Sequence, residues 1–566
     1  MSKSILYIVV PAAITCAACG AAVPSPGDSD STDTDDSASE SGGSAESADT
    51  GDEPGGHGVS LNVNRDVDVL FVIDNSGSMG EEQGLLAAGL PAFIGVLEAE
   101  GAPANYRIGV TTTDNGNPWC GSTSPEAGNL VLSSCRSRTG EFVFNGNPPA
   151  DATAQACTDV CSLDTIEILP TTTELDTQPR PRPWVESIEG KTNLGGDIST
   201  TAALQCFAPQ GLVGCGFESH LESMYKSFLR SQNADEEQYG FLRSNAILAV
   251  VMLSDEGDCS YNNEYQSIFL SEAEGGNPAV FWSDPDASAP TSAVCWNAGV
   301  SCEGSGMPYE SCSATNKDVN GAQHVPDGEA VLHPVSRYSS FVQELENSKQ
   351  QITPNQEVLV AMITGVPQDY SGELIYADAL DPVEQADFGI GAGCAYEDGD
   401  PMTPLATARP PAREKEFAEA FEVGSQPNLY SICQESYAGA LEAIANSIRD
   451  QIRPACMTTC VADTNQIMAG LQPSCSLIQE APAPGGGGID ETVIEPCGAE
   501  GSLPADADVC FDVLVDDALS GECADEGWNL ELRLVRREGV PAPGGTAVSV
   551  SCELSQNKQI DCPNLP

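Results

Sequence analysis

Five apolar segments that alternate with helical patterns constrain the fold of this chain more than any other feature. Each segment is a near-continuous hydrophobic run of strand length, which is typical of strands buried on both faces. Because strands that alternate with helices form a parallel sheet covered on both faces, the sequence predicts a doubly wound, mostly parallel α/β fold. We expect strands at 67–74, 106–114, 246–258, 357–365 and 428–433, and helices at 81–99, 218–229, 338–347 and 435–452. Gly89 and Pro91 are expected to kink or split the first helix.

The rest of the chain divides into insertions and a C-terminal region. Long irregular segments at 115–195, 259–335 and 366–410 carry many cysteines, so we expect disulfide-rich insertions within a domain spanning 61–452. The last part of the chain alternates short strands with Gly/Pro turns and cysteines, which predicts a small disulfide-rich β domain at 453–566. Its strands are expected at 510–517, 529–538 and 546–554.

The N-terminal region has the pattern of an export signal. One lysine, an apolar run and small residues predict a signal peptide at 1–19. The stretch CAACG at 16–20 resembles a bacterial lipoprotein processing box, which implies lipidation of Cys19 and delivery to the outer membrane or cell surface. Cys16 stands where that family usually has leucine, so ordinary cleavage a few residues later stays open. Residues 20–60 are acidic and rich in Ser, Asp and Gly, which predicts a disordered linker.

Charge and cysteine content narrow the function. The 84 acidic and 23 basic residues give a formal net charge of -61, which disfavours nucleic acid and anionic lipid surfaces as partners. No other apolar run is long enough to span a membrane, so the lipid is the only membrane attachment we expect. Of the 22 cysteines, 20 follow Cys19, and we expect mostly local disulfides in an oxidising compartment. The CxxxC pairs at 157/161 and 456/460 lack the spacing of zinc sites.

Two polar groups follow buried strands, at the edge where doubly wound sheets bind ligands. Asp74, Ser76 and Ser78 follow the first strand, and Asp255 follows the third. A carboxylate and two hydroxyls at alternate positions can converge on one point, and a carboxylate from a neighbouring strand adds charge. Oxygen ligands match a hard cation, with Mg²⁺ first and Mn²⁺ or Ca²⁺ next. The alternative is an ordinary strand-ending turn, because Asp, Asn, Ser and Gly all favour turns.

The DxSxS pattern that closes the first strand, together with the later aspartate, resembles the von Willebrand factor type A (vWA) domain over residues 66–452. The resemblance implies that family's metal-ion-dependent adhesion site (MIDAS), with Asp74, Ser76 and Ser78 in the first loop and Asp255 in the third. In that family the metal keeps one coordination position for an acidic side chain of a partner protein. The resemblance therefore implies a binding module.

The second loop of this sequence departs from the family, which supplies a threonine there. The aligned residue is Cys215, while another alignment uses Thr200 or Thr201. Sulfur does not replace a hydroxyl on Mg²⁺. Cys206 lies nine residues before Cys215 and is the disulfide partner that we expect to pin this loop. Glu218 is expected to aim a carboxylate at the metal, directly or through water. An added carboxylate favours Ca²⁺ relative to Mg²⁺.

Two functions stay open from the sequence. The first is an envelope-anchored, divalent-metal-dependent adhesion module that recognises a protein or surface-polymer ligand. The second is a structural envelope lipoprotein with a degenerate, metal-free vWA fold. Enzymatic activity is not expected, because HExxH, GxSxG and GxGxxG motifs are absent and none of the four histidines adjoins a nucleophile motif.

Overall fold

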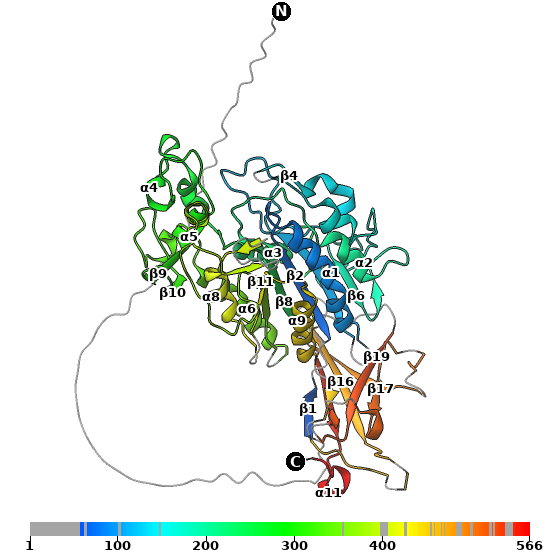
Figure 1. Ribbon diagram of the computed structural model, residues 1–566. Coiled ribbons are helices and arrows are strands. Elements are labelled where there is room, and N and C mark those ends of the chain that lie inside the picture. The colour runs from blue at the N-terminus through cyan, green and yellow to red at the C-terminus, as the bar shows by residue number, and fades with distance from the viewer. Residues whose placement is uncertain are drawn as a thin grey trace, which may run out of the picture. The chain divides into compact units, whose positions relative to one another are not determined.

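A computed structural model gives the fold of the chain, shown in Figure 1. It describes residues 57–61 and 65–565, apart from several short gaps. The gaps are 100–102, 147–148, 354–355, 397–405, 424–426, 453–454, 483–488, 499–501, 520–522, 525–526, 538–546 and the single positions 458, 466, 469 and 506. The predicted signal peptide, Cys19 and most of the acidic linker lie outside the described residues.

The larger part of the chain contains a central seven-stranded sheet with the order β14-β11-β8-β2-β3-β6-β7. Neighbouring strands from β14 to β3 run parallel, whereas β6 and β7 form an antiparallel edge that the sequence did not predict. All five predicted strands are present, although β8 ends at Leu253, before the polar residues that follow. The strands are β2 (Asp66–Ile73), β3 (Asn105–Thr112), β6 (Val185–Ile188), β7 (Lys191–Thr192), β8 (Ile247–Leu253), β11 (Leu359–Thr364) and β14 (Leu429–Ser431).

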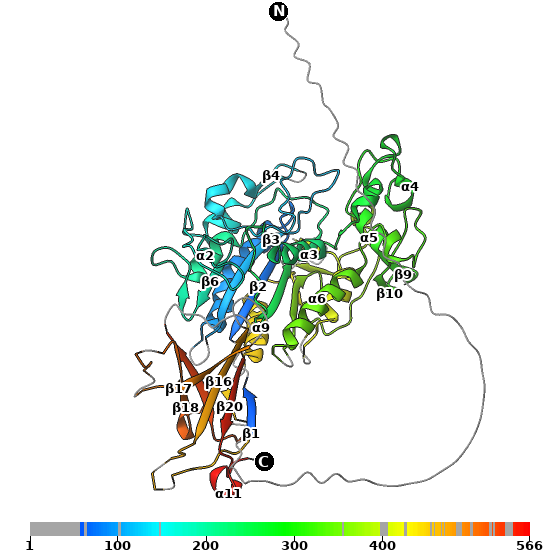
Figure 2. The same ribbon diagram turned by 180° about the vertical axis from the view of Figure 1, so that it is seen from behind.

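Helices cover both faces of this sheet, as the hydrophobic strands require. Side chains alternate along β2, so that Phe71 packs in one hydrophobic cluster and Val72 in the other. Figure 1 shows α1, α2 and α9 on the first face, and Figure 2 shows α3 and α6 on the second. The helices are α1 (Gly80–Leu97), α2 (Thr200–Phe207), α3 (His220–Ser231), α6 (Val335–Gln350), α8 (Ala412–Glu419) and α9 (Ala438–Gln451). The predicted α/β class is thus confirmed as a parallel-rich sheet between helices.

Helix α1 is not split at Gly89 or Pro91, so that part of the prediction is wrong. The helix continues without interruption through both residues. A methyl group at Gly89 would lie 2.8 Å from Leu441 Cδ1 of α9, too close for a real contact. The glycine therefore allows α1 and α9 to pack closely, and this packing stabilises a helix whose sequence alone predicts a break.

Ten disulfides join all 20 cysteines that follow Cys19, which confirms that they are oxidised. The cysteines of both CxxxC pairs bond to four different partners, so neither pair forms a thiolate zinc site. Seven of the ten bonds lie within a single predicted insertion or within the C-terminal region, which confirms the expectation of mostly local bonds, although only two close loops of fewer than 20 residues. The bonds are Cys120–Cys215, Cys135–Cys157, Cys161–Cys206, Cys259–Cys295, Cys302–Cys312, Cys394–Cys433, Cys456–Cys523, Cys460–Cys562, Cys475–Cys552 and Cys497–Cys510.

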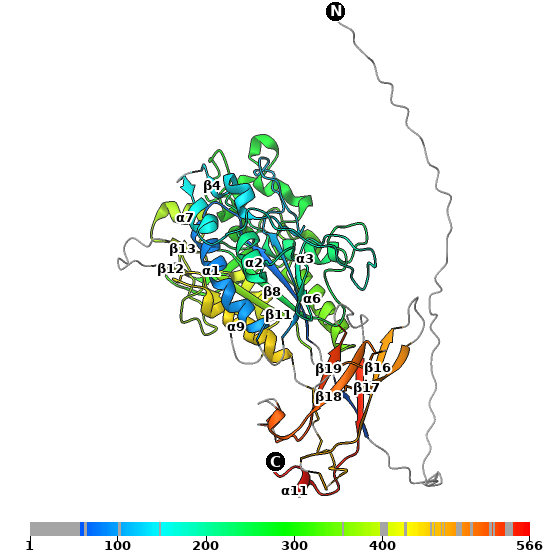
Figure 3. The same ribbon diagram turned by 90° about the vertical axis from the view of Figure 1, so that its right-hand side faces the viewer.

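A second sheet, formed mainly by C-terminal residues, has the order β1-β20-β16-β17-β18-β19-β15, and its strands from β16 to β20 are the orange and red arrows in Figure 3. Three of its strands match the predicted ones, while β15, β16 and β17 were not expected. Its edge strand β1 comes from residues that the sequence assigned largely to the linker, and it pairs antiparallel with β20. The strands are β1 (His57–Leu61), β15 (Ala455–Cys456), β16 (Cys475–Pro482), β17 (Ile489–Pro496), β18 (Val509–Leu514), β19 (Glu531–Arg536) and β20 (Ala547–Cys552). None of the helices described is long and apolar enough to cross a membrane.

A buried ion pair fixes the end of the sheet opposite the polar strand ends. Asp68 of β2 is fully buried, and its Oδ1 lies 2.9 Å from Arg243 Nε. The backbone N–H of Arg243 donates to Asp68 Oδ2 at 2.6 Å, and its guanidinium donates to the carbonyls of Val67 and Asn105. The pair therefore ties the segment before β8 to the starts of β2 and β3.

We predict that Asp68→Ala destabilises the folded chain by about 3–5 kcal/mol, because it leaves the Arg243 charge buried without its main partner. The free energy of unfolding, measured by chemical denaturation, checks this. Glu344→Ala on the exposed face of α6 is the matched control and should stay within about 0.5 kcal/mol. Equal effects of the two substitutions would contradict the anchoring role of Asp68.

Candidate metal centre

The first loop of the candidate site is organised around Asp74, which follows β2 directly. Its side chain is fully buried, and its Oδ1 accepts a hydrogen bond of 2.8 Å from the backbone N–H of Ser76. This bond curls the turn so that the residues after it return toward the aspartate. The other carboxylate oxygen, Oδ2, accepts a hydrogen bond of 2.6 Å from Ser254 Oγ at the end of β8. Ser254 was not singled out by the sequence, although its position after a buried strand is the same signal that marked Asp74.

The structure brings the four residues of the two strand ends together. The hydroxyl oxygens of Ser76 and Ser78 lie 3.2 Å apart. Ser78 Oγ donates to Asp255 Oδ1 at 3.2 Å, which joins the loop after β2 to the loop after β8. Asp74, Ser76 and Asp255 are buried, whereas Ser78 is exposed. The result is a small set of carboxylate and hydroxyl oxygens with one side open to solvent.

The second loop packs against the first, but its chemistry differs from the expectation. Cys215 forms its disulfide with Cys120, and Cys206 bonds to Cys161, so the predicted Cys206–Cys215 bond is wrong. Disulfide pairing depends on proximity in the fold, and Cys120 lies in the loop that follows β3. The backbone N–H of Cys215 also donates to Asp114 Oδ2 at 3.2 Å. The strand-end residue Asp114 thus holds the loop by hydrogen bonding.

The alternative alignment of the second loop fails. Thr200 is buried at the start of α2, where its hydroxyl accepts a hydrogen bond of 2.8 Å from Tyr106. Tyr106 lies near the start of β3, whereas the candidate site lies at the ends of the parallel strands. Thr200 and its neighbour Thr201 are therefore at the wrong end of the sheet to reach a cation held by Asp74.

Gln83 joins the first and second loops, and sequence analysis missed it. This fully buried residue of α1 donates from Nε2 to the carbonyl of Asp74 at 2.7 Å and to that of Gly211 at 2.9 Å. Its Oε1 accepts from the backbone N–H groups of Gln210 and Gly211 at 2.8 and 3.0 Å. A polar residue in the first turn of a helix is usually solvated, so the sequence carried no signal for this role.

Buried carboxyl groups are concentrated around the four candidate residues. Burial, with Asp74 close by, raises the pKa of Asp255 to about 7. Burial together with Asp255 raises the pKa of both Glu82 and Glu256 to about 8. Burial next to Glu256 and Asp74 raises the pKa of Glu218 well above its usual range. These shifts all report carboxylates that lack enough positive charge nearby.

Two of these carboxyl groups have buried oxygens without a hydrogen-bond partner among the described residues, namely Glu82 Oε2 and Glu218 Oε1. Asp258 behaves differently: burial alone would raise its pKa, but His220 and Arg413 outweigh burial and lower it. Carboxyl groups without a full positive partner therefore adjoin the candidate site, and such surroundings suit a hard divalent cation.

The described residues contain no group of three or more His, Cys, Asp or Glu side chains arranged to hold a metal ion. Glu218 therefore does not form a carboxylate cage with Asp74 and Asp255. The predicted ligand set also includes the hydroxyls of Ser76 and Ser78, with the carboxylate of Glu218 acting directly or through water. In this arrangement Glu218 fits a role through water better than direct coordination.

Comparisons with known proteins assign neither a family nor a function. No protein-family model matches the chain, and no curated protein matches it. Two crystal structures of the pilus adhesin SpaC from Lactobacillus rhamnosus GG, one in an open conformation, are similar at 11% and 12% sequence identity, with TM-scores of 0.26 and 0.27. The aligned part covers 87% of this chain but only 40% and 39% of the adhesin chains. TM-scores this low carry no argument about the fold or function of this chain.

We predict that stability falls with rising pH when divalent cations are removed by a chelator. The carboxyls of Asp255, Glu82 and Glu256 have folded pKa values of about 7, 8 and 8, whereas unfolded carboxyls titrate near about 4. Between these values the folded chain holds protons that the unfolded chain has lost, so raising the pH favours unfolding. Thermal unfolding midpoints measured from about pH 5 to pH 8.5 should decrease.

Glu82→Gln should make this decrease smaller, because it removes one of the groups that holds a proton. Glu344→Gln, on an exposed helical face, is the control and should leave the slope unchanged. A midpoint that rises over this range in chelator would show that these carboxyls are compensated in the folded chain.

Proposed function

We propose that this protein is an exported, lipid-anchored binding module that captures a protein or surface polymer through a divalent cation held by Asp74, Ser76, Ser78 and Asp255. The observation that carries the proposal is the convergence of these four residues from two neighbouring strand ends, amid carboxylates without positive partners. Lipid on Cys19 would supply the anchor, and the ten disulfides are typical of an exported chain. The proposal includes no catalytic step.

The topology supports a vWA-type domain. The DxSxS loop follows β2 at the centre of the sheet, and Asp255 follows β8, which pairs directly with β2. These two strand ends are adjacent, so an ion between them receives ligands from both loops without any rearrangement of the sheet. The helices on both faces fix the strands, and the loops alone carry the site.

The overall charge gives a physical reason for metal dependence. A surface with a formal net charge of -61 repels an acidic partner at long range. A cation at the open side of Ser78 would reverse the local sign and offer a coordination position to a carboxylate. Capture of an acidic group therefore needs the cation, and a chelator should release the partner.

We predict that the full chain binds Ca²⁺, Mg²⁺ or Mn²⁺, with Ca²⁺ at least competitive with Mg²⁺, and that Asp74→Ala and Asp255→Ala each abolish binding. Removal of a direct ligand should lower the affinity for the ion by more than the factor of about 10–100 that is typical of outer-shell residues. Calorimetry with each ion measures the affinity. Asp286→Asn, in an exposed loop, is the control and should bind like the wild type. If no divalent ion binds at about 1 mM, the structural, metal-free alternative is the function that remains.

We predict that Glu218→Gln weakens Ca²⁺ binding about tenfold, because the carboxylate supports the ion through water and the amide lacks its charge. The substitution keeps the size of the side chain, so the second loop should stay folded. Calorimetry should show a smaller loss for Mg²⁺, which is bound by fewer protein oxygens. Stronger Ca²⁺ binding by the variant would mean that Glu218 blocks the open position instead of supporting the ion.

A further inference from the structure

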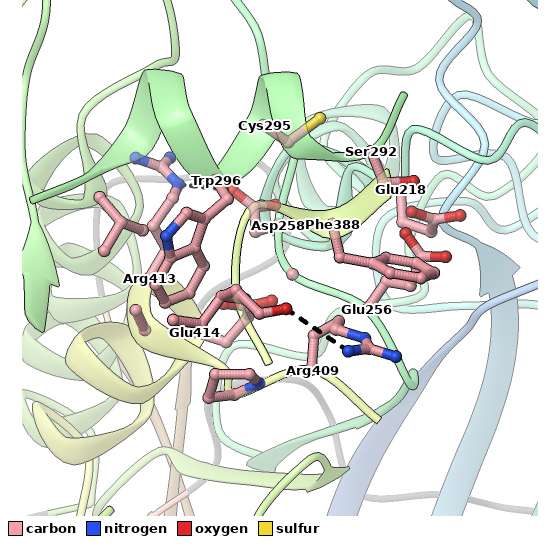
Figure 4. Close-up of a pocket in the computed structure, with 15 residues that line it drawn as sticks. Glu218, Glu256, Asp258, Ser292, Cys295, Trp296, Phe388, Arg409, Arg413 and Glu414 are labelled. Atoms are coloured by element: carbon pink, nitrogen blue, oxygen red, sulfur yellow. Dashed lines mark hydrogen bonds and ion pairs between the residues drawn. The ribbon is translucent and has the colours of Figure 1, made fainter. Parts of the chain in front are cut away.

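A pocket built mainly by the insertions lies beside the candidate metal centre (Figure 4). The empty space within it, including solvent at its open mouth, is about 420 Å³. Glu218 and Glu256 line it on the side of the metal centre, whereas Trp296 of α5 (Ala293–Gly299) and Phe388 of α7 (Pro382–Phe388) contribute aromatic rings. Glu414 lines it from the first turn of α8. The pocket thus combines carboxyl groups with apolar walls.

The two guanidinium groups that line the pocket are already paired. Arg413 Nε lies 3.1 Å from Asp258 Oδ2, and Arg409 Nη1 lies 2.6 Å from Glu384 Oε1, outside the pocket lining. Arg409 also stacks over the Phe388 ring, 4.0 Å from its centroid. Neither guanidinium neutralises the remaining carboxyls, Glu218, Glu256 and Glu414. The lining therefore holds three carboxyls that no guanidinium pairs with, and an approaching ammonium group would favour their ionised forms.

Three buried oxygens in this lining have no hydrogen-bond partner in the described part of the chain: Glu218 Oε1 and both carboxyl oxygens of Glu414. The two residues are only 1% and 3% exposed, so water does not readily replace the missing partners. His220 Nδ1 lies 3.8 Å from both Glu414 Oε1 and Asp258 Oδ1, beyond hydrogen-bond distance. Burying a carboxyl oxygen without a partner is unfavourable, and a ligand that donates hydrogen bonds would offset this.

The chemistry of the lining favours an alkylammonium group over a metal ion. The described carboxyls do not gather into a metal-holding group of three, and the aromatic walls offer no ligand to a hard cation. A lysine side chain packs its hydrocarbon stem on aromatic surface and carries three N–H donors at its end. An ammonium near the face of Trp296 would also gain cation–π attraction.

We propose that this pocket binds a lysine side chain of the captured partner, with the ammonium group held by Glu414 and Glu218 and the stem packed against Trp296. Lysine binding in this pocket does not need the metal. The inference rests on the proposed function only because one partner would occupy both the pocket and the metal centre. The partner then presents an acidic side chain to the cation and a lysine to the pocket.

The test uses the full chain and two small probes, Nα-acetyl-lysine amide and the neutral Nα-acetyl-norleucine amide. Binding is followed by ligand-observed NMR in chelator at about 0.15 M salt, which screens non-specific attraction to the net charge. The lysine probe should bind with a dissociation constant in the millimolar range, and the norleucine probe should bind at least about tenfold more weakly. Glu414→Gln should lower the affinity for the lysine probe about tenfold or more.

Gly257→Ala provides a variant that fills the pocket without disturbing the fold. Its added methyl would lie 3.9 Å from Glu414 Oε1, an ordinary van der Waals distance, in the space the ammonium would occupy. It should reduce binding of the lysine probe at least about fivefold. Gly439→Ala in α9, where a methyl meets nothing within 4 Å, is the matched control and should bind normally. If Glu414→Gln does not fold, as judged by circular dichroism, Gly257→Ala decides the question.

Equal binding of the two probes, or no binding of the lysine probe at about 10 mM, would overturn the proposal. Because these measurements are made in chelator, they do not depend on the metal centre. Lysine binding by a chain that binds no divalent ion would support the pocket and refute the proposed metal-dependent function. Divalent binding without lysine binding would support the proposed metal-dependent function and refute the lysine pocket.

Discussion

The arrangement of this site depends on the burial of carboxyl groups at the ends of two central strands. Asp74 and Asp255 lie next to each other because β2 and β8 pair in parallel, and the folded chain removes both from most of the solvent. Burial disfavours their charged forms, and each carboxylate makes the next harder to ionise. The fold is compatible with this cluster only if protons or a cation supply the positive charge. A cluster that is compatible with the fold both when protonated and when bound to a cation is suited to respond to cation concentration.

The loops around the cluster are held by interactions that do not depend on a cation. Gln83 binds both the carbonyl of Asp74 and the backbone at Gly211, and the Cys120–Cys215 disulfide ties the second loop to the segment after β3. A methyl at Gly214 would lie 2.1 Å from Asn75 Oδ1, so the two loops approach each other more closely than any other residue there would permit. The oxygens of the candidate site are therefore held in place without a cation, and the disulfide at Cys215 restrains the loop next to them.

The sequence predicted the parts of the fold that depend on local pattern. The runs that form β2 and β8 are apolar on both faces, and the polar residues that follow them mark the strand ends. The sequence therefore predicted that Asp74 and Asp255 lie close together at one edge of the sheet. The short antiparallel strands β6 and β7 carry no such run, and their position depends on pairing with β3. The partner of Cys215 could not be predicted because loop packing, and not spacing, brings two cysteines together. Gln83 was missed because its role depends on a loop more than 100 residues away.

The insertions explain why so much of the chain lies outside the regular α/β elements. They place α5, α7 and the start of α8 over one side of the strand ends, and in doing so they surround Glu218 and Glu414 with aromatic rings and paired arginines. Arg409 donates its backbone N–H to the carbonyl of Asp255, so the wall of the pocket and the metal loop are directly bonded. On the proposed function, a cation beside Asp255 would attract acidic groups, whereas the carboxyls of the pocket would attract basic ones. Two adjacent positions of opposite preference discriminate among partners better than either one, because a partner must match both charges and their separation.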